Sequence, residues 1–232
     1  MLVATIRALK FNGGLKKDET SKVDMVALKK GIVNLIAHIE MLGRIFNVNV
    51  IVALNKFITD TDEEVDFVKD TCNVSGARFV CCEAWAKGGE GAEELARAVV
   101  DVAEHNESNM TYAYESEDSI LDKIKKVAVK IYGADDVKLS VKAKKHLKVI
   151  EDLGYGKLPI CIAKTQYSLS DNANLLGRPN GFTMNVEDIE LRSGAGFVVV
   201  IAGNIMLMPG LSKSPAASKM TIDENNKITG LF

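Results

Sequence analysis

Hydrophobic residues in the first hundred positions form short continuous runs separated by longer stretches with helical spacing. The runs at residues 2–8, 48–54 and 77–82 are rich in apolar and β-branched side chains, which is typical of parallel strands covered on both faces. Over residues 22–44, apolar positions recur every three or four residues, as in an amphipathic helix. Shorter helical patterns follow the second and third runs. This alternation predicts an α/β fold with a doubly wound parallel sheet.

Capping residues mark where these helices begin and end. Ser21 and Gly43 predict the start and the end of the long helix. Thr61 and Glu64 have the spacing of a capping box, so we expect the next helix to begin there and to reach about residue 73. A third helix is expected over residues 92–104.

The pattern changes near residue 108. Helices expected at 117–131 and 140–152 precede a stretch that contains all four prolines and the predicted strands 158–163, 187–192, 196–202 and 219–222. Doubly wound sheets usually have five or more strands, whereas only three precede this change. We therefore expect an α/β domain at 1–108 with an incomplete, partial sheet. A smaller α+β domain should follow at 109–232.

Composition and charge narrow the classes of function. The chain has 29 Lys and Arg against 31 Asp and Glu, so no overall field attracts nucleic acid or an anionic membrane. Its apolar runs are far shorter than the roughly 20 residues that cross a bilayer, and no export leader follows Met1. We therefore expect a cytoplasmic protein without nucleic-acid or membrane partners. The cysteines and histidines lack metal-ligand spacing, so we expect no metal site.

The clearest candidate site lies in the loops that follow the predicted strands, where parallel sheets bind ligands. Phe57 and Trp85 leave successive strands, so their rings could face each other across a slot for a flat heterocycle. Asn55, Lys56 and Asp60 surround Phe57 in sequence. Two other interpretations remain open. The loop faintly resembles the Asn-Lys-x-Asp loop that reads guanine, although its acid is two residues too late, and Trp85 could simply fill the core.

A lysine-rich stretch covers residues 123–148 and contains only two acidic residues, Asp135 and Asp136. A solvent-exposed helix face is the simplest interpretation of such a run. A docking surface for a polyanionic tail is the alternative. Its nine lysines are Lys123, Lys125, Lys126, Lys130, Lys138, Lys142, Lys144, Lys145 and Lys148.

Several strings resemble one enzyme family. The string VATIRALKFNGG at residues 3–14 is similar to the second signature of formate–tetrahydrofolate ligases. Six further strings resemble that family in the same order: NKFITDTD (55–62), WAKGGEG (85–91), PICIAKTQ (159–166), LGRP (176–179), MPGL (208–211) and GLF (230–232). The resemblance covers the whole chain, but members of the family are roughly twice as long.

The resemblance implies a reaction and a site. In the family, ATP phosphorylates formate, and the N10 amine of tetrahydrofolate attacks the formyl phosphate to give 10-formyltetrahydrofolate, ADP and phosphate. Phe57 and Trp85 would sandwich the pterin ring. ATP and Mg would be bound only through the missing N-terminal half, which carries a Gly-Lys-Thr phosphate loop. The residues that the resemblance implies near the phosphate end are Arg7, Lys10, Asn12, Gly13 and Gly14.

The chain departs from the family pattern at two places. Many members have Arg-Phe-Pro where this chain has Lys56, Phe57 and Ile58, and Leu-Pro where it has Leu211 and Ser212. The loss of a proline gives the loop more freedom before binding and costs some preorganisation of the slot. The stacking residue Phe57 is retained.

The leading hypothesis is the C-terminal part of a formate–tetrahydrofolate ligase, which binds folate and is inactive on its own. Its partners would be folate and the N-terminal ligase half or a partner subunit, and we expect a homo-oligomer. The alternative is a stand-alone, non-catalytic module for pterin binding or oligomerisation.

Overall fold

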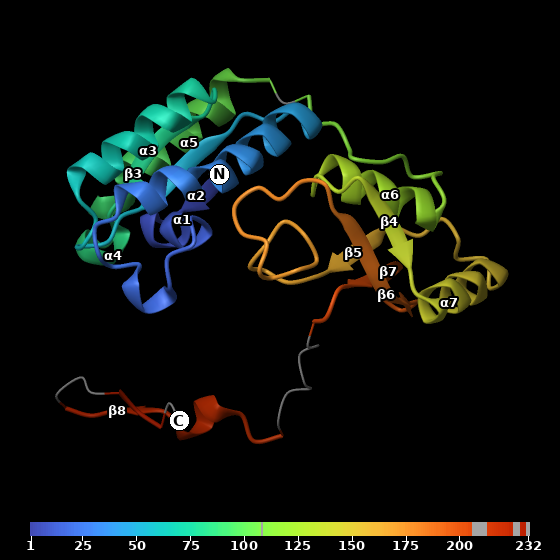
Figure 1. The fold of residues 1–232 in the computed structure, drawn as a ribbon. Coiled ribbons are helices and arrows are strands. Elements are labelled where there is room, and N and C mark those ends of the chain that lie inside the picture. Colours follow the sequence, from blue (N-terminus) through green and yellow to red (C-terminus); the bar gives the residue numbers. More distant parts are fainter. Residues whose placement is uncertain (108, 206–212, 225–227, 231–232) are drawn as a thin grey trace.

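Two sheets organise the chain, each with its own helices (Figure 1). The computed structural model describes residues 1–107, 109–205, 213–224 and 228–230. We refer to residues 1–107 as the N-terminal lobe and to residues 109–205 as the C-terminal lobe. The strings MPGL and Leu211-Ser212, and the last two residues of GLF, fall outside the described residues.

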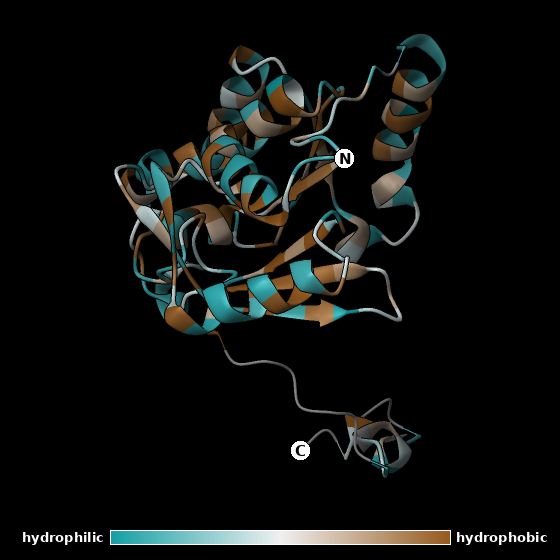
Figure 2. Ribbon diagram, turned by 90° about the vertical axis from the view of Figure 1, so that its right-hand side faces the viewer, coloured by the Kyte–Doolittle hydropathy of each residue, from teal (hydrophilic) through white to brown (hydrophobic). Residues whose placement is uncertain are grey.

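The N-terminal lobe is built on three parallel strands in the order β1 (Leu2–Ala4), β2 (Ile51–Asn55) and β3 (Arg78–Cys82). Side chains of β2 alternate between two clusters. Val52 and Leu54 pack with α2 (Met25–Glu40) and α3 (Asp62–Val74), whereas Ile51 packs with α5 (Glu93–His105). Helices therefore cover both faces of the sheet, as the doubly wound prediction requires. Hydrophobic strands between helices of mixed hydropathy are visible in Figure 2.

The expected strand at residues 2–8 and the loop after it are wrong in their boundaries. Thr5 ends the strand because its side chain accepts a hydrogen bond from the Ala8 N–H at 3.1 Å. This N-cap starts a helix, α1 (Ile6–Asn12), where the sequence predicted first strand and then loop. As a result, Arg7 and Lys10 project from a helix.

The long helix also differs at both ends. It begins after Asp24, which accepts from the Ala27 N–H at 2.8 Å, and not after Ser21. It does not stop at Gly43, because the chain continues through a π-helical turn at Met41–Ile45. The capping box of Thr61 and Glu64 is confirmed.

The C-terminal lobe has a mixed four-stranded sheet in the order β4-β6-β7-β5, in which only β6 and β7 are antiparallel. Its strand β4 was not predicted, because its alternation of polar and apolar residues extends over only four positions between two lysine-rich helices. The strand β6 begins four residues earlier than expected. The elements are α6 (Ile120–Lys130), β4 (Asp136–Leu139), α7 (Val141–Asp152), β5 (Ile160–Ala163), β6 (Thr183–Arg192) and β7 (Phe197–Ala202). Beyond this lobe, the predicted strand 219–222 is reduced to β8 (Thr221–Ile222), which pairs with β9 (Ile228–Thr229).

Two glycines let α1 and α2 touch backbone to backbone. A Cβ atom at Gly31 would lie 1.8 Å from the carbonyl oxygen of Leu9, and one at Gly13 would lie 1.9 Å from that of Ala27. Both distances are far inside van der Waals contact. The position of α1 against α2 therefore requires residues without a Cβ atom at Gly13 and Gly31.

A buried ion pair ties α1 to α3. The Lys10 ammonium lies 2.7 Å from Glu64 Oε1 and donates to the Lys22 carbonyl at 2.6 Å, and neither charged side chain is exposed. The other oxygen of Glu64 accepts from the Thr61 N–H at 3.1 Å. Burial opposes ionisation of Glu64, but the hydrogen bonds from Lys10 and Thr61 outweigh it, so the pKa of this carboxyl is lowered.

Replacing Gly31 with Ala should destabilise the chain. Alanine is the better helix former, but its Cβ would overlap the Leu9 carbonyl and force the helices apart. Overpacking of this kind typically costs about 1–3 kcal/mol in the free energy of unfolding, which urea denaturation would measure. Gly43→Ala is the matched control, since a Cβ at that position would have nothing within 4 Å. Equal stability of the two variants would contradict the close crossing.

Replacing Lys10 with Met should cost about 3–5 kcal/mol at pH 7, because Glu64 would remain buried without its cation. The folded pKa of Glu64 is below its unfolded value of about 4.3, so the pair stabilises the wild type above that pH and the gain is lost as the pH falls through the folded pKa. In the variant, unpaired burial raises that pKa, and protonation in acid relieves the cost.

Urea unfolding between pH 4 and pH 7 would therefore show a difference in the free energy of unfolding between wild type and Lys10→Met, and this gap becomes smaller in acid. Lys22→Met removes an exposed ion pair with Glu19 and should change stability by less than about 1 kcal/mol. A gap that is small at pH 7, or that widens in acid, would contradict this account.

Candidate functional site

Phe57 and Trp85 leave the first sheet at matching positions. Asn55, the last residue of β2, is paired in register with Cys82, the last residue of β3. The next backbone contact, from the Lys56 N–H to the Cys82 carbonyl at 3.0 Å, holds the two exits together. Both aromatic residues therefore begin from the same edge of the sheet, where parallel strands present their ligand loops.

The loop that carries Phe57 is folded by its own polar residues. Asp60 Oδ2 accepts from the Phe57 N–H at 2.9 Å, and Lys56 pairs with Asp62 at 3.1 Å. Burial raises the pKa of the Asp60 carboxyl, and the Phe57 N–H offsets part of this effect. Because Asp60 is almost fully buried and turned onto its own loop, it does not present the carboxylate that guanine reading would need.

Trp85 lies on a short helix, α4 (Ala84–Lys87), and 76% of its surface is exposed. The alternative in which Trp85 fills the core is therefore wrong. The segment after it folds back, with the Glu83 N–H donating to the Gly91 carbonyl at 3.0 Å. A Cβ at Gly91 would lie 2.5 Å from the Glu83 carbonyl oxygen, so this closure requires glycine.

Arg7 covers one face of the half-buried Phe57. Its guanidinium carbon lies 4.2 Å from the ring centroid, and its Nη2 donates to Thr59 Oγ1 at 3.2 Å. The Nε atom is buried and has no partner among the described residues. Arg7, Phe57 and Trp85 follow β1, β2 and β3 in the chain, which is also the order of these strands in the sheet.

The other residues expected near a phosphate have different surroundings. Lys10 is the buried partner of Glu64, so its ammonium does not reach the surface. Gly13 lies in the helix crossing, and Gly14 turns the chain with a φ of +99°. Asn12 reaches the other lobe and accepts from the Gly177 N–H at 3.1 Å.

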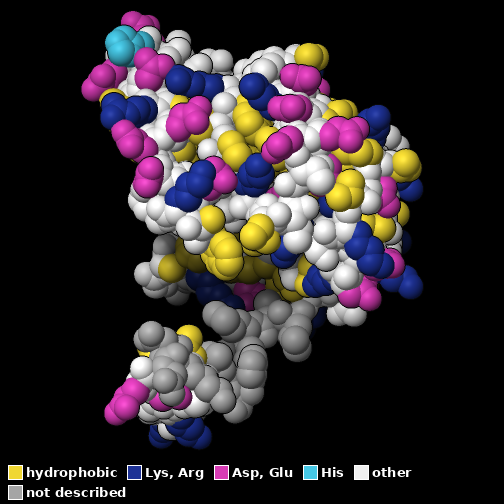
Figure 3. Space-filling view, turned by 90° about the vertical axis from the view of Figure 1, so that its left-hand side faces the viewer, with side chains coloured by type: hydrophobic (Ala, Val, Ile, Leu, Met, Phe, Trp, Pro, Cys, Tyr) yellow, Lys and Arg dark blue, Asp and Glu magenta, His cyan; other side chains and the backbone are white. Residues whose placement is uncertain are grey.

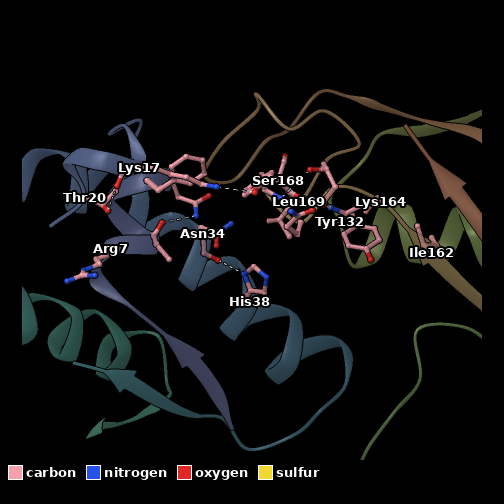
Figure 4. Close-up of a pocket in the computed structure, with 16 residues that line it drawn as sticks. Arg7, Lys17, Thr20, Asn34, His38, Tyr132, Ile162, Lys164, Ser168 and Leu169 are labelled. Carbon is pink, nitrogen blue, oxygen red and sulfur yellow. Dashed lines mark hydrogen bonds between the residues drawn. The ribbon is translucent and has the colours of Figure 1, made fainter. Parts of the chain in front are cut away.

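A cleft of about 710 Å³ separates α1 and α2 from the loop after β5 (Figure 4). Arg7 and Lys164 lie toward its opposite ends. None of the described residues that line it is Asp or Glu. The outer face in Figure 3, by contrast, intersperses acidic and basic side chains. The Arg, Lys, Phe and Tyr residues that line the cleft are Arg7, Phe11, Lys17, Tyr132, Lys164 and Tyr167.

Loop residues 165–179 attach the C-terminal lobe to α1 and α2. Gly177 is held on both sides, since Asn12 accepts from its N–H and Asn34 donates to its carbonyl at 2.8 Å. Its φ of +74° favours glycine, and a Cβ there would lie 3.3 Å from a methyl group of Val33. Arg178 adds an ion pair with Glu40 at 2.7 Å. Sequence reasoning singled out the string LGRP but gave it no role, because a loop that docks on another lobe leaves no periodic signal.

Lys164 shapes that same loop. Its ammonium donates to the carbonyls of Thr165 at 2.9 Å, Ser168, and Ser170 at 3.1 Å, and lies 4.9 Å from the Tyr132 ring centroid. Burial lowers the pKa of Lys164 to about 8. Lys164 lies within the string PICIAKTQ, which resembles the family but predicts no role for this lysine.

Seven of the nine lysines in the lysine-rich stretch are exposed, as the interpretation as a solvated face predicts, whereas Lys126 is partly buried and Lys123 is fully buried. Lys123 is buried and donates to the carbonyls of Ser116 and Lys157 at 2.7 and 2.6 Å. Lys126 pairs with Asp118, and Lys142 with Asp188. Several of these lysines therefore stabilise the C-terminal lobe itself, and the interpretation as one solvated face is wrong for Lys123.

Two features are absent from the part of the chain that the structure describes. No group of three His, Cys, Asp or Glu side chains there is arranged to hold a metal ion. No helix among those residues has the length and apolar character needed to cross a membrane.

Comparisons with known proteins agree along the whole chain. The family model described as formate–tetrahydrofolate ligase matches residues 1–232. A formate–tetrahydrofolate ligase of Campylobacter concisus (strain 13826) is 53% identical over 231 residues, which cover 100% of this chain and 42% of that protein. One from Psychrobacter sp. (strain PRwf-1) is 50% identical over 235 residues, 100% of this chain and 41% of that protein. The chain thus spans about two fifths of the length of these relatives, and it belongs to the formate–tetrahydrofolate ligase family.

Proposed function

We propose that this chain supplies the folate-binding part of a formate–tetrahydrofolate ligase, with Phe57 and Trp85 on the two faces of the pterin ring. The observation that carries the proposal is the paired exit of these residues from β2 and β3. Arg7 backs Phe57 on one side, while Trp85 is exposed rather than packed in the core. Two aromatic walls at the ligand edge of a parallel sheet suit a flat heterocycle.

The proposed reaction joins formate to tetrahydrofolate with ATP and releases 10-formyltetrahydrofolate, ADP and phosphate. This chain's part is to bind and orient the pterin, so that the N10 amine is held against the formyl carbon that it attacks. Asn55, Lys56 and Asp60 shape the pterin loop. Of the residues that we place toward the phosphate end, Arg7 has an N–H donor without a partner at Nε among the described residues. The others hold α1 in position; they are Lys10, Asn12, Gly13 and Gly14.

ATP and Mg are assigned to a part of the ligase outside these 232 residues. The sequence contains no Gly-x-x-x-x-Gly-Lys-Ser/Thr string, so it lacks the backbone cradle that such loops supply to phosphates. We infer that the phosphate-binding half acts with this chain, in the same polypeptide or as a separate subunit. The partial three-stranded sheet, with β1 at one edge, fits a continuation in that half.

The proposal includes a domain boundary near residue 108, which separates the α/β domain from the α+β domain. It also includes a homo-oligomer in the cytoplasm.

A stand-alone pterin-binding or oligomerisation module is less favoured. The family model and both relatives match the full length of the chain, which such a module would not require.

Replacing Phe57 or Trp85 with Ala should weaken tetrahydrofolate binding by more than tenfold. Each stacked face contributes about 0.5–1.5 kcal/mol beyond buried area, and the lost contact area adds to it. Equilibrium dialysis would measure both variants. Trp85 is the only tryptophan, so its fluorescence should also be quenched by tetrahydrofolate in the wild type and respond much less in Phe57→Ala.

Tyr112→Ala provides the control for these two variants. Tyr112 is 73% exposed and lies away from the strand exits, so its removal should leave the affinity unchanged. If the wild type binds tetrahydrofolate and neither Phe57→Ala nor Trp85→Ala reduces the affinity, the pterin slot is refuted.

The purified 232-residue chain should not form 10-formyltetrahydrofolate from formate, ATP and tetrahydrofolate. Without a phosphate loop, the charge of the transferred phosphoryl group has no cradle. The measurement is product formation compared with a no-enzyme blank. ATP-dependent product above that blank would show that the assignment of phosphoryl chemistry to another part is wrong.

A further inference from the structure

A second cavity, of about 790 Å³, lies where the chain passes from one lobe to the other. Phe46 lines it from the N-terminal lobe, and the segment 112–116, α6 and the loop before β5 line it from the C-terminal lobe. Thr111 holds that segment in place, since its N–H donates to the Phe46 carbonyl at 3.0 Å and its hydroxyl to the Ile45 carbonyl at 2.6 Å. We call this space the linker cavity. Its volume and its position between lobes are those of sites for small molecules.

The walls of the linker cavity suit a flat ring. Apolar side chains provide most of the described lining, and several of them are aromatic, so a planar ligand can stack on them. Tyr112 is the most accessible, because 73% of its surface is exposed. The aromatic and aliphatic residues that line the cavity are Phe46, Tyr112, Ala113, Tyr114, Val127, Ile131, Tyr132 and Pro159.

Lys123 adds a buried positive charge to this apolar wall. Its ammonium donates to the carbonyls of Ser116, Lys157 and Leu158 at 2.7, 2.6 and 3.3 Å. It also lies 5.5 Å from the Tyr114 ring centroid. Burial lowers the pKa of Lys123, because the loss of water disfavours the charged form. The three carbonyl oxygens satisfy its N–H groups, but they do not neutralise its charge.

Nearby carboxylates leave that charge largely uncompensated. Asp118 and Glu117 are close enough to favour the charged form of Lys123, but each of them pairs with another lysine. Glu115 and Lys157 also line the cavity, and both are exposed, so water screens their charges. A carboxylate inside the cavity would therefore be attracted mainly by Lys123, in surroundings that screen it less than bulk water.

We propose that the linker cavity binds a small aromatic carboxylate, with its ring against Tyr112 and Tyr114 and its carboxylate toward the Lys123 ammonium. Within the described residues, the cavity shares only Tyr132 with the cleft beside α1 and α2, and it includes no residue of the Phe57 loop. The site is therefore separate from the proposed pterin slot, and the inference does not rest on the proposed function. A ligand in it would contact Tyr132, whose ring lies 4.9 Å from Lys164 Nζ in the wall of the cleft (Figure 4).

The test uses 2-naphthoate, which joins two fused aromatic rings to one carboxylate. Isothermal titration into the 232-residue chain should show one bound molecule per chain. The neutral analogue 2-naphthamide should bind about tenfold more weakly, because it keeps the shape but loses the attraction to Lys123. Removing the charge from the ligand leaves the buried lysine and its three hydrogen bonds in place.

Variants of one exposed residue locate the site. Tyr112→Ala should weaken naphthoate binding about fivefold or more, since it removes an aromatic wall. Tyr112→Phe keeps the ring and should bind like the wild type. Tyr155→Ala is the matched control, because Tyr155 is also an exposed tyrosine of the C-terminal lobe but does not line the cavity. It should leave the affinity unchanged.

Any of four results would overturn the inference. They are no binding of naphthoate to the wild type, equal affinities for naphthoate and naphthamide, equal affinities of Tyr112→Ala and wild type, and displacement of naphthoate by tetrahydrofolate. The last result would make the cavity part of a folate site. Tetrahydrofolate binding, followed by Trp85 fluorescence, tests the pterin slot separately, so failure of the linker cavity can be distinguished from failure of the proposed function.

Discussion

The buried contact between Lys10 and Glu64 fixes the geometry of the candidate site. A lysine and a glutamate without solvent contact are tolerable only while each satisfies the other, because an unpaired buried charge is strongly destabilising. One oxygen of Glu64 binds Lys10 on α1 while the other caps the Thr61 N–H at the end of the Phe57 loop. This link therefore joins α1, which carries Arg7, to the loop that carries Phe57, and the Arg7 guanidinium lies on the Phe57 ring.

Helix α1 also contacts three other parts of the structure. Its backbone touches α2 at Gly13 and Gly31, its first turn carries Arg7, and Asn12 at its end binds the Gly177 N–H of the other lobe. A seven-residue helix would not be stable alone, so its position is set by these contacts on every side. Helix α1 therefore contacts both the Phe57 loop and Gly177, which lie more than a hundred positions apart in sequence.

The sequence predicted what local rules control and missed what distant contacts decide. Buried strands and the Thr61 capping box leave periodic or fixed-spacing signals, and the structure confirms them. The strand predicted through residue 8 stops at Ala4, because the cap by Thr5 overrides an apolar run. The family resemblance implied that Lys10 lies near a phosphate, yet its ammonium is buried and pairs with Glu64, 54 positions away in sequence. The docking of Gly177 likewise depends on Asn12 and Asn34, which no local pattern connects to it.

The distribution of cations favours the proposed pterin site over a triphosphate site at this edge of the sheet. Near the ligand edge of the first sheet, Lys10 is used by Glu64, Lys56 by Asp62 and Lys87 by Glu83. Of the cations considered at that edge, Arg7 alone has a buried N–H without a partner in the described ranges, and its guanidinium already lies on Phe57. Stabilising a transferred phosphoryl group requires several convergent positive charges or a metal. What the edge offers instead is two aromatic side chains that follow neighbouring strands, which favours the binding and orientation of a flat ring, as the proposed pterin site requires.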